Sequence, residues 1–257
     1  MNYFSPETAA ARYAKGRPDF HSNTIGHIRE KLGLEQKLSK ALDVACGTGL
    51  STKALLEIAE EVYGTDTSEA MLAHAPEKDR IHYGIAPAEQ QPFPDHMFDL
   101  ITVCSGVHWF RINAFLAESA RILKSRGWLV LYENHFIAEM DGHPEFRNWF
   151  HERYLQQFPS PPRNNDYPWN NEHLNTLGWE LTGTETFTNP IRFNKEELIL
   201  YFSTQSNIIA ATEQGRATYT EAEAWLNNEL SPFFSDNEQK QLIHYGNWIK
   251  YIKKMEN

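Results

Sequence analysis

From residue 41 onward, short apolar runs alternate with stretches in which apolar residues recur at helical spacing. The stretch 112–124 shows the helical pattern, because Ile112, Phe115, Leu116 and Ile122 fall on one face. Strands are predicted near 41–46, 61–66, 80–85, 98–104 and 127–133, and helices near 51–60, 68–74 and 112–124. Such alternation is typical of an α/β fold in which helices cover a parallel sheet.

Two helices are predicted before this region. Ser5-Pro6-Glu7 reads as a helix start, with serine as the N-cap and proline at the first helical position. That helix should end before Gly16-Arg17-Pro18. A second helix, with its apolar face over 25–32, should stop near Gly33.

The pattern changes after residue 135. Pro144 opens an aromatic-rich helical stretch, and the proline-rich segment 159–168 is predicted to be irregular. Residues 179–190 alternate like a strand, 194–232 look helical, and 242–253 read as a closing strand.

Composition narrows the range of partners. A formal net charge of −10 argues against a nucleic-acid partner or an anionic membrane surface. Cys46 and Cys104 form no disulfide framework, so two buried, reduced thiols are expected. No apolar run approaches the roughly 18 residues of a membrane span, and the first residues lack a signal-peptide pattern. We therefore expect a cytoplasmic protein.

The segment 41–52, ALDVACGTGLST, is the most informative stretch of the chain. An apolar strand ends in a Gly47-Thr48-Gly49 turn before a helical pattern, an arrangement that brings backbone N–H groups close to a ligand. Thr52 stands where a dinucleotide-binding fingerprint has its third glycine. Asp43 would repel a pyrophosphate but would suit an ammonium or sulfonium group. The turn thus favours an amino-acid-bearing nucleoside over NAD.

A second carboxylate, Asp66, ends the next predicted strand, 19 residues after Gly47. A carboxylate at this place can accept hydrogen bonds from both ribose hydroxyls. The alternative is a helix N-cap for the segment that begins at Thr67.

Four segments together resemble the class I S-adenosylmethionine (SAM)-dependent methyltransferases. They are LDVACGTG at 42–49, GTDTSEAML at 64–72, AEQQPFPDHMFDL at 88–100 and RILKSRGWL at 121–129. The last is close to the family's LKPGG hairpin but has Ser-Arg in place of Pro-Gly. Each segment is weak alone, and their order and spacing carry the resemblance.

The resemblance implies a Rossmann-like, mostly parallel sheet of seven strands, the last antiparallel, with helices on both faces and a helical lid. A single domain over 1–257 is expected. Its core would be 35–135 plus the strands near 179–190 and 242–253. The lid would come from 1–34, 136–177 and 194–232.

The resemblance also implies the cofactor SAM, the product S-adenosylhomocysteine (SAH) and a cofactor-binding set. That set is Asp43, Ala45, Gly47, Thr48, Gly49, Asp66, Thr67, Met71, Ala88, Glu89, Ser105, Tyr13 and Arg17. Ala88 and Glu89 would meet the adenine edge, although Glu89 could be a solvated charge. Arg17, within the family's "Y…RP" helix, could pair with a carboxylate of cofactor or substrate, or be a surface arginine.

The acceptor site should follow the fourth and fifth strands, because ligands collect beyond the carboxyl ends of parallel strands. The pair His108-Trp109 resembles the "HW" signature of trans-aconitate methyltransferase-like enzymes, and no Pro-Pro-Tyr turn of nucleobase enzymes is present. Glu133 and His135 add polar groups there. We expect a small-molecule acceptor, with oxygen as the acceptor atom and a carboxylate as one option. His108 is either a general base or a wall of the site.

Some alternatives stay open on the sequence. A non-catalytic SAM-binding protein of the same fold would share these motifs, and an NAD(P)-dependent dehydrogenase would want the missing third glycine. The histidines lack a metal-ligand spacing, so no metal is expected. The oligomeric state is left open.

Overall fold

The computed structural model describes residues 7–162, 166–236 and 238–255. The predicted N-cap pair at residues 5 and 6 lies outside them. The chain forms two compact units. The sheet unit comprises the described residues of Asp19–Asn134, Arg163–Phe187 and Asn247–Asn257, and the aromatic unit those of Met1–Pro18, His135–Pro162 and Thr188–Gly246.

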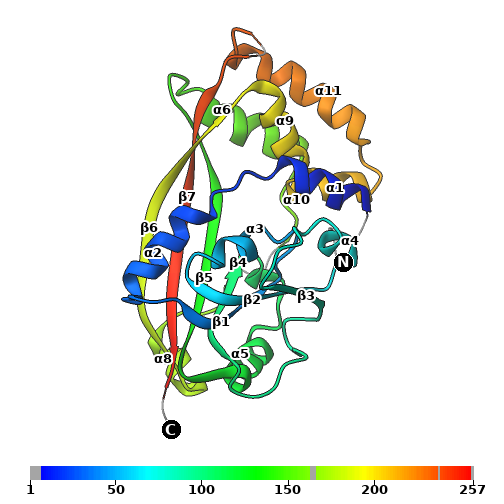
Figure 1. Ribbon diagram of the computed structural model, residues 1–257. Helices are drawn as coiled ribbons and strands as arrows, with labels where there is room; N and C mark the ends of the chain where they lie inside the picture. The colour runs from blue at the N-terminus through cyan, green and yellow to red at the C-terminus, as the bar shows by residue number, and fades with distance from the viewer. Residues whose placement is uncertain (1–6, 163–165, 237, 256–257) are drawn as a thin grey trace. The chain divides into compact units, whose positions relative to one another are not determined.

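The described residues form the predicted seven-stranded sheet, with strand order β3-β2-β1-β4-β5-β7-β6 (Figure 1). The strands are β1 (Leu38–Val44), β2 (Ala59–Asp66), β3 (Ile81–Ile85), β4 (Phe98–Cys104), β5 (Leu123–Met140), β6 (Trp179–Phe193) and β7 (Gln241–Lys254). Strands β1 to β5 pair in parallel. The last strand, β7, is antiparallel as expected. Its first residues meet the end of β5, where Asp141 N donates to Leu242 O, and its end meets the start of β6, where Met255 N donates to Gly178 O.

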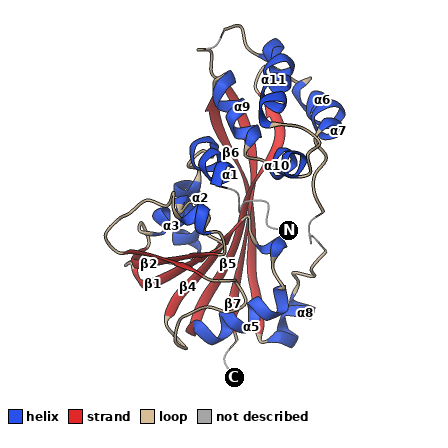
Figure 2. Cartoon of the chain, turned by 90° about the vertical axis from the view of Figure 1, so that its right-hand side faces the viewer, coloured by secondary structure: helices blue, strands red, loops and turns tan. Residues whose placement is uncertain are grey.

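Helices fill the connections, as Figure 2 shows. They are α1 (Glu7–Gly16), α2 (His21–Lys31), α3 (Leu50–Leu55), α4 (Glu69–Leu72), η1 (Val107–Trp109), α5 (Ile112–Ile122), α6 (Phe146–Trp149), η2 (Phe150–Tyr154), α7 (Leu155–Gln157), α8 (Asn171–Leu174), η3 (Asn175–Leu177), α9 (Lys195–Ser203), α10 (Ser206–Glu213), α11 (Tyr219–Leu230) and η4 (Ser231–Phe233).

Successive residues of a strand point to opposite faces of the sheet, so the two faces pack into two different hydrophobic cores. Leu100 of β4 and Val130 of β5 pack with apolar residues of α2 and α3. Their neighbours Ile101 and Leu129 pack instead with α5 and α8. The sheet unit is therefore covered by helices on both faces, and α2, within the predicted lid range 1–34, packs in one of its cores.

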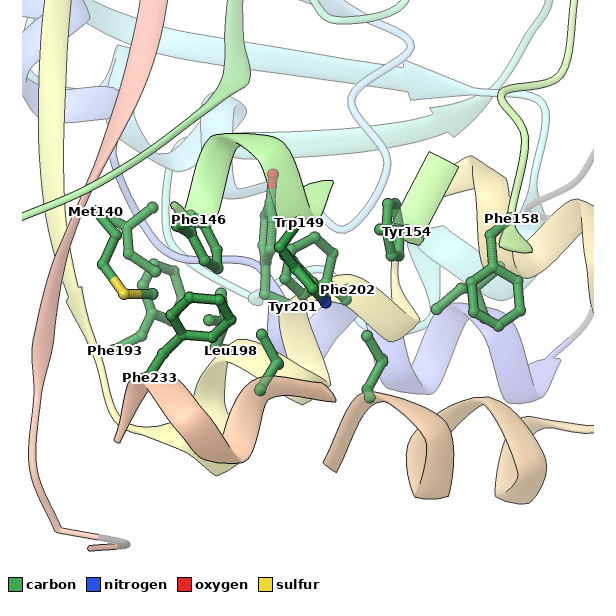
Figure 3. Close-up of a cluster of buried hydrophobic side chains, with 14 of the residues drawn as sticks. Met140, Phe146, Trp149, Tyr154, Phe158, Phe193, Leu198, Tyr201, Phe202 and Phe233 are labelled. Atoms are coloured by element: carbon green, nitrogen blue, oxygen red, sulfur yellow. The ribbon is translucent and has the colours of Figure 1, made fainter. Parts of the chain in front are cut away.

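The aromatic unit has a core of its own, in which aromatic rings dominate (Figure 3). Phe202 of α9 lies near Trp149 and Tyr154, with ring centroids 5.7 and 4.7 Å apart. Helix α1 crosses α9 with its backbone in close contact. A Cβ on Gly16 would lie 2.8 Å from Leu200 O. Glycine at this position therefore allows α1 to approach α9 closely.

Several predicted boundaries were wrong. Helix α3 ends at Leu55 instead of residue 60, because Ala59 already pairs with Leu38 in the sheet. Strand β5 starts at Leu123, where it pairs with Phe98, and runs on to Met140 instead of ending at 133. The helix predicted to open at Pro144 and the helical region predicted over 194–232 are divided into shorter pieces, the first by the π-helical turn η2. The described part of 159–168 contains no helix or strand, as predicted.

Candidate active site

The turn after β1 requires both of its glycines. Gly47 and Gly49 have φ of 55° and 74°, in the left-handed region, and Gly49 is the N-cap of α3. A Cβ on Gly49 would lie 3.0 Å from Tyr83 Cζ, and one on Gly47 would lie 3.1 Å from Met71 Cε. Thr48, between them, is buried. The turn is therefore closed in by Tyr83 of β3 and Met71 of α4.

Asp43 is fully buried beneath this turn. Its Oδ2 accepts hydrogen bonds from Ser51 Oγ at 2.6 Å and Thr52 Oγ1 at 2.8 Å, and its Oδ1 accepts one from Thr102 Oγ1 at 3.0 Å. Burial raises the pKa of Asp43 to about 6, although the three hydroxyls favour its charged form. Asp43 thereby ties together β1, the start of α3 and β4. Contact with an ammonium group stays a prediction.

Asp66 joins the glycine turn to the end of β2. Its Oδ2 accepts from Gly47 N at 2.9 Å and its Oδ1 from Ser68 N at 2.8 Å. Burial raises the pKa of Asp66, and the N–H donors partly oppose that shift. The N-cap of α4 is Ser68, whose Oγ accepts from Met71 N. Asp66 therefore joins the glycine turn to Ser68, the N-cap residue of α4, and is not itself the helix cap. Thr67, between Asp66 and Ser68, is exposed.

Two neighbouring strands end in strained residues. Ala45, after β1, has φ of 57°, and Ser105, after β4, has φ of 52°. Left-handed backbone at non-glycine residues costs energy and gathers at functional sites. A Cβ on Gly106 would lie 2.9 Å from Ala45 Cβ, so the two strand ends touch. Ser105 N donates to Tyr132 O at 3.0 Å, which extends this edge to β5.

The loop after β3 is bound to the start of α5. Glu89 Oε1 accepts from Arg111 N at 2.7 Å, and the Glu89 side chain is only 13% exposed. Glu89 is thus held in place and is not a solvated charge. Ala88 beside it is buried. The same loop meets β2, because Ala86 N donates to Asp66 O at 3.1 Å.

His108 and Trp109 form the short helix η1 directly after β4. Their rings are tilted, with centroids 4.7 Å apart, and Trp109 is 41% exposed. An aromatic surface is thus presented beyond the carboxyl end of β4.

Glu133 and His135 do not end β5, as the sequence suggested, because the strand continues to Met140. Glu133 still follows Tyr132, the partner of Cys104 at the end of β4. His135 is exposed and lies in the aromatic unit, where a Cβ on Gly246 would meet its ring. The two residues therefore belong to different units.

Tyr13 and Arg17 also belong to the aromatic unit. Arg17 Nη2 donates to Thr204 O at 3.1 Å, and its guanidinium lies 4.7 Å from the Tyr13 ring centroid and 5.2 Å from that of Tyr201. Arg17 is therefore a packed residue. Its pairing with a ligand carboxylate stays a prediction.

The structure thus places most predicted residues in the sheet unit. There it holds Asp43, Ala45, Gly47, Thr48, Gly49, Asp66, Thr67, Met71, Ala88, Glu89, Ser105, His108, Trp109 and Glu133. Apart from Glu133, which lies inside β5, they lie at the carboxyl ends of the parallel strands or in the connections that follow. Tyr13, Arg17 and His135 lie in the other unit.

Sequence reasoning missed the hydroxyls that bind Asp43. Thr52 was read only as the absent third glycine, yet it donates to Asp43. Ser51 and Thr52 lie at the start of the helix that follows the glycine turn, and this position could have identified them as partners of Asp43. His21 was also missed. Its Nδ1 lies 3.1 Å from Tyr132 Oη, and burial lowers its pKa to about 4.

Both cysteines are free thiols. Burial raises the pKa of Cys46 and takes that of Cys104 to about 12, so both are protonated and unreactive near neutral pH. Among residues 7–162, 166–236 and 238–255 no group of three or more His, Cys, Asp or Glu side chains could hold a metal ion. Nor does any helix of these ranges have the length and apolar character to cross a membrane.

Part of this chain matches a known protein family. Residues 42–131, from β1 to β5, match the methyltransferase domain family. A Dictyostelium discoideum protein whose name assigns it to the methyltransferases is 25% identical over 207 residues, 79% of this chain and 77% of that protein. A ubiquinone/menaquinone biosynthesis C-methyltransferase of Paraburkholderia phymatum is 40% identical over 105 residues, but these cover only 37% of this chain and 42% of that enzyme.

Solved structures agree on the fold. A type II methyltransferase structure from Anaeromyxobacter dehalogenans superposes with a TM-score of 0.71 and covers 93% of this chain and 97% of its own, at 19% identity. The strand order, the glycine turn with its two carboxylates and the family match at 42–131 agree with one another. Residues 42–131 therefore form a methyltransferase domain, in a chain whose fold is the Rossmann-like fold typical of methyltransferases.

Proposed function

We propose that this enzyme transfers a methyl group from SAM to an oxygen atom of a small-molecule acceptor, with a carboxylate as the acceptor group. The observation that carries the cofactor part is the clasp of Asp66 on Gly47 N and Ser68 N. It fixes a carboxylate beside a left-handed glycine turn at the carboxyl edge of the sheet, where open α/β sheets bind ligands.

The residues present fit SAM. The Asp66 carboxylate accepts backbone hydrogen bonds, among them those from Gly47 N and Ser68 N, and has lone pairs left for the ribose hydroxyls. Gly47, Thr48 and Gly49 leave no side chain on the turn larger than threonine, and the methionine part would lie against them. Glu89 and Ala88 would meet the adenine edge from the loop after β3. Met71 would pack on the adenosine.

The chemistry asks mainly for positioning. When bound, SAM supplies a methyl group from its sulfonium centre, and the leaving group, SAH, is a neutral thioether. The protein must hold the acceptor in line and keep water away. Trp109 would form an apolar wall of the acceptor site beyond β4, and the strand ends at Ala45 and Ser105 would form its floor.

The need for a base depends on the acceptor atom. A carboxylate is ionised near neutral pH and needs none, so the rate should be nearly flat between about pH 6 and 8. A hydroxyl or an acidic carbon needs proton removal, and His108 would accept that proton. The C-methyltransferase relative makes carbon a fair alternative, although its match covers less than half of that enzyme.

Calorimetry tests the cofactor. Titration with SAM and SAH in the presence of a chelator should give binding heat, and no heat at millimolar ligand would overturn the proposal.

A panel of small carboxylic acids, phenols and amines tests the acceptor. It is run with wild type, Arg17→Ala, His108→Ala and the exposed control His74→Ala. We expect turnover of acids that survives His108→Ala. Activity on phenols alone, lost by about 10²-fold in His108→Ala and unchanged in Arg17→Ala, would reverse the preference. SAH binding without turnover of any acceptor would favour a non-catalytic SAM-binding protein.

A further inference from the structure

One row of paired residues crosses four strands of the sheet unit beneath the glycine turn. Tyr83 of β3 pairs with Gly64 of β2. Gly64 pairs with Asp43 of β1, which in turn pairs with Thr102 of β4. Paired residues of neighbouring strands point to the same face of a sheet. Tyr83 therefore shares the face on which Thr102 Oγ1 donates to Asp43.

The Tyr83 side chain extends along this row from the edge strand β3 (Figure 1). A Cβ on Gly64 would lie 2.9 Å from Tyr83 Cδ1 and Cε1, so the ring covers Gly64. The same Cβ would lie 3.0 Å from Thr52 Oγ1. The ring thus reaches over β2 to the first turn of α3, where Thr52 donates to Asp43. A side chain at position 64 would occupy the space that the ring now fills.

The end of the Tyr83 side chain lies against the glycine turn itself. The place that a Cβ on Gly49 would take overlaps the Tyr83 hydroxyl and lies 3.0 Å from Tyr83 Cζ. Gly49 has a left-handed φ of 74° and is the N-cap of α3. One ring from β3 therefore fills the space left by two glycines, Gly64 in the neighbouring strand and Gly49 in the turn.

The contact acts by packing. Burial raises the pKa of the Tyr83 hydroxyl, so the phenol is neutral near neutral pH and brings no charge to the turn. A turn that is already held in its binding conformation does not have to be ordered by the ligand. Fixing the backbone of one residue costs about one decade of affinity. Without the ring, the space beneath Gly49 would be empty and the turn would lose this support.

We propose that Tyr83 is a positioning residue for the cofactor, whose ring holds the glycine turn in the conformation that receives the amino-acid part of SAM. This deepens the proposed function and rests on it for the identity of the ligand. Tyr83 acts through Gly49 and is not a catalytic residue.

The test compares Tyr83 with Tyr63, a half-buried tyrosine of β2. Tyr63 points to the opposite face, where its ring centroid lies 5.5 Å from that of Phe93 and 5.4 Å from that of Phe98. Two ligands are titrated by calorimetry: SAH, and 5′-methylthioadenosine, which lacks the amino-acid part. The proteins are wild type, Tyr83→Ala, Tyr83→Phe and the control Tyr63→Ala, and urea unfolding gives the stability of each.

We expect Tyr83→Ala to bind SAH at least about tenfold more weakly than wild type, and 5′-methylthioadenosine with nearly unchanged affinity. Tyr83→Phe keeps the ring and should recover most of the affinity for SAH. Tyr63→Ala should lose stability, because its ring packs in a core, but should keep its affinity for both ligands.

The proposal is overturned if Tyr83→Ala and Tyr63→Ala bind SAH equally well, or if Tyr83→Phe binds it as weakly as Tyr83→Ala. An equal loss for both ligands would also overturn it, because a tyrosine that only stabilises the fold would not select between them. Failure of the proposed function is different, since wild type itself would then not bind SAH. If Tyr83→Ala does not fold, Tyr83→Leu and Tyr63→Leu replace the alanine pair, with the same expectations.

Discussion

Two carboxylates, Asp43 and Asp66, lie close to the same glycine turn, and their different partners give them different roles. Asp43 is surrounded by three side-chain hydroxyls and holds the strands beneath the turn. Asp66 accepts from two backbone N–H groups and remains partly exposed. Asp43 is therefore expected to govern stability, and Asp66 to govern ligand binding.

Asp66→Asn should weaken SAH binding by at least about tenfold. One carboxylate oxygen is replaced by an amide nitrogen, which cannot accept from a ribose hydroxyl or from Gly47 N, and charge-assisted hydrogen bonds are worth about 1.5–3 kcal/mol each. Calorimetry measures the dissociation constant. Asp99→Asn is the matched control, because Asp99 binds Lys40 N and Lys124 Nζ at the opposite end of the sheet. Equal affinities in the two variants would count against the ribose role.

Asp43→Asn should change the pH dependence of stability. The folded-state pKa of Asp43 is about 6, above its ordinary value of 3.8, so the native state holds its proton more tightly than the unfolded state does. Wild-type stability from this residue is therefore complete below about pH 4 and is lost as the pH rises towards 6. The loss is about 3 kcal/mol for a shift of about two units. Urea unfolding across this range should show that the free energy of unfolding of the variant rises relative to that of wild type as the pH rises. If the two proteins have the same pH dependence of stability, the raised pKa of Asp43 is contradicted.

At the residue scale, the sequence predicted the type of chemistry but not the partners. Asp43 and Asp66 were both singled out from the glycine turn and the strand ends. Thr102, which donates to Asp43, lies 59 residues further along the chain. Its proximity depends on β4 lying next to β1, and a single sequence does not contain that pairing.

At the scale of elements, the close packing of β3 on the glycine turn sets what the turn can tolerate. Gly49→Ala places a Cβ at a left-handed φ of 74° and against the Tyr83 ring. We expect a loss of about 1–3 kcal/mol in the free energy of unfolding. Gly84→Ala is the control in β3, because a Cβ there meets nothing within 4 Å. Urea unfolding of both variants measures the difference, and similar losses would show that the turn is not constrained.

Element type was easier to predict than element length. The alternating pattern identified each parallel strand, because buried strands carry compact apolar runs. The length of β5 escaped prediction, since residues 134–140 owe their strand conformation to the partner β7, more than 100 positions later. The Pro144 helix was interrupted by a π-helical turn that no local signal marks.

At the scale of the molecule, β5, β6 and β7 each begin in one unit and end in the other. Because these strands contribute residues to both units, unfolding of one unit should disrupt the other, and we expect a single calorimetric transition. SAH at about 100 times its dissociation constant should stabilise the fold by about 2.7 kcal/mol and raise the melting temperature by about 5–10 °C. Differential scanning calorimetry checks both statements. Two separate transitions, with SAH moving only one, would show that the units unfold independently.

The mostly parallel sheet of seven strands followed from the resemblance of the four segments within 42–129, where the motifs are dense. The division into two units did not follow, because the aromatic unit is assembled from three separate stretches of chain. Its core is built from aromatic residues that have no regular spacing in the sequence, such as Trp149, Tyr154 and Phe202. The sequence alone therefore does not show which of these residues pack together.

The close crossing of α1 on α9 at Gly16 has a consequence for synthesis. Roughly 180 residues separate the two helices, and a ribosome adding 5–20 residues per second needs about 10–40 s to produce them. During that interval the first helix has emerged but its docking partner does not yet exist. The nascent chain must therefore carry α1 unpacked while β1 to β4 are already available to pair, so the crossing of α1 on α9 can form only after most of the sheet has been synthesised.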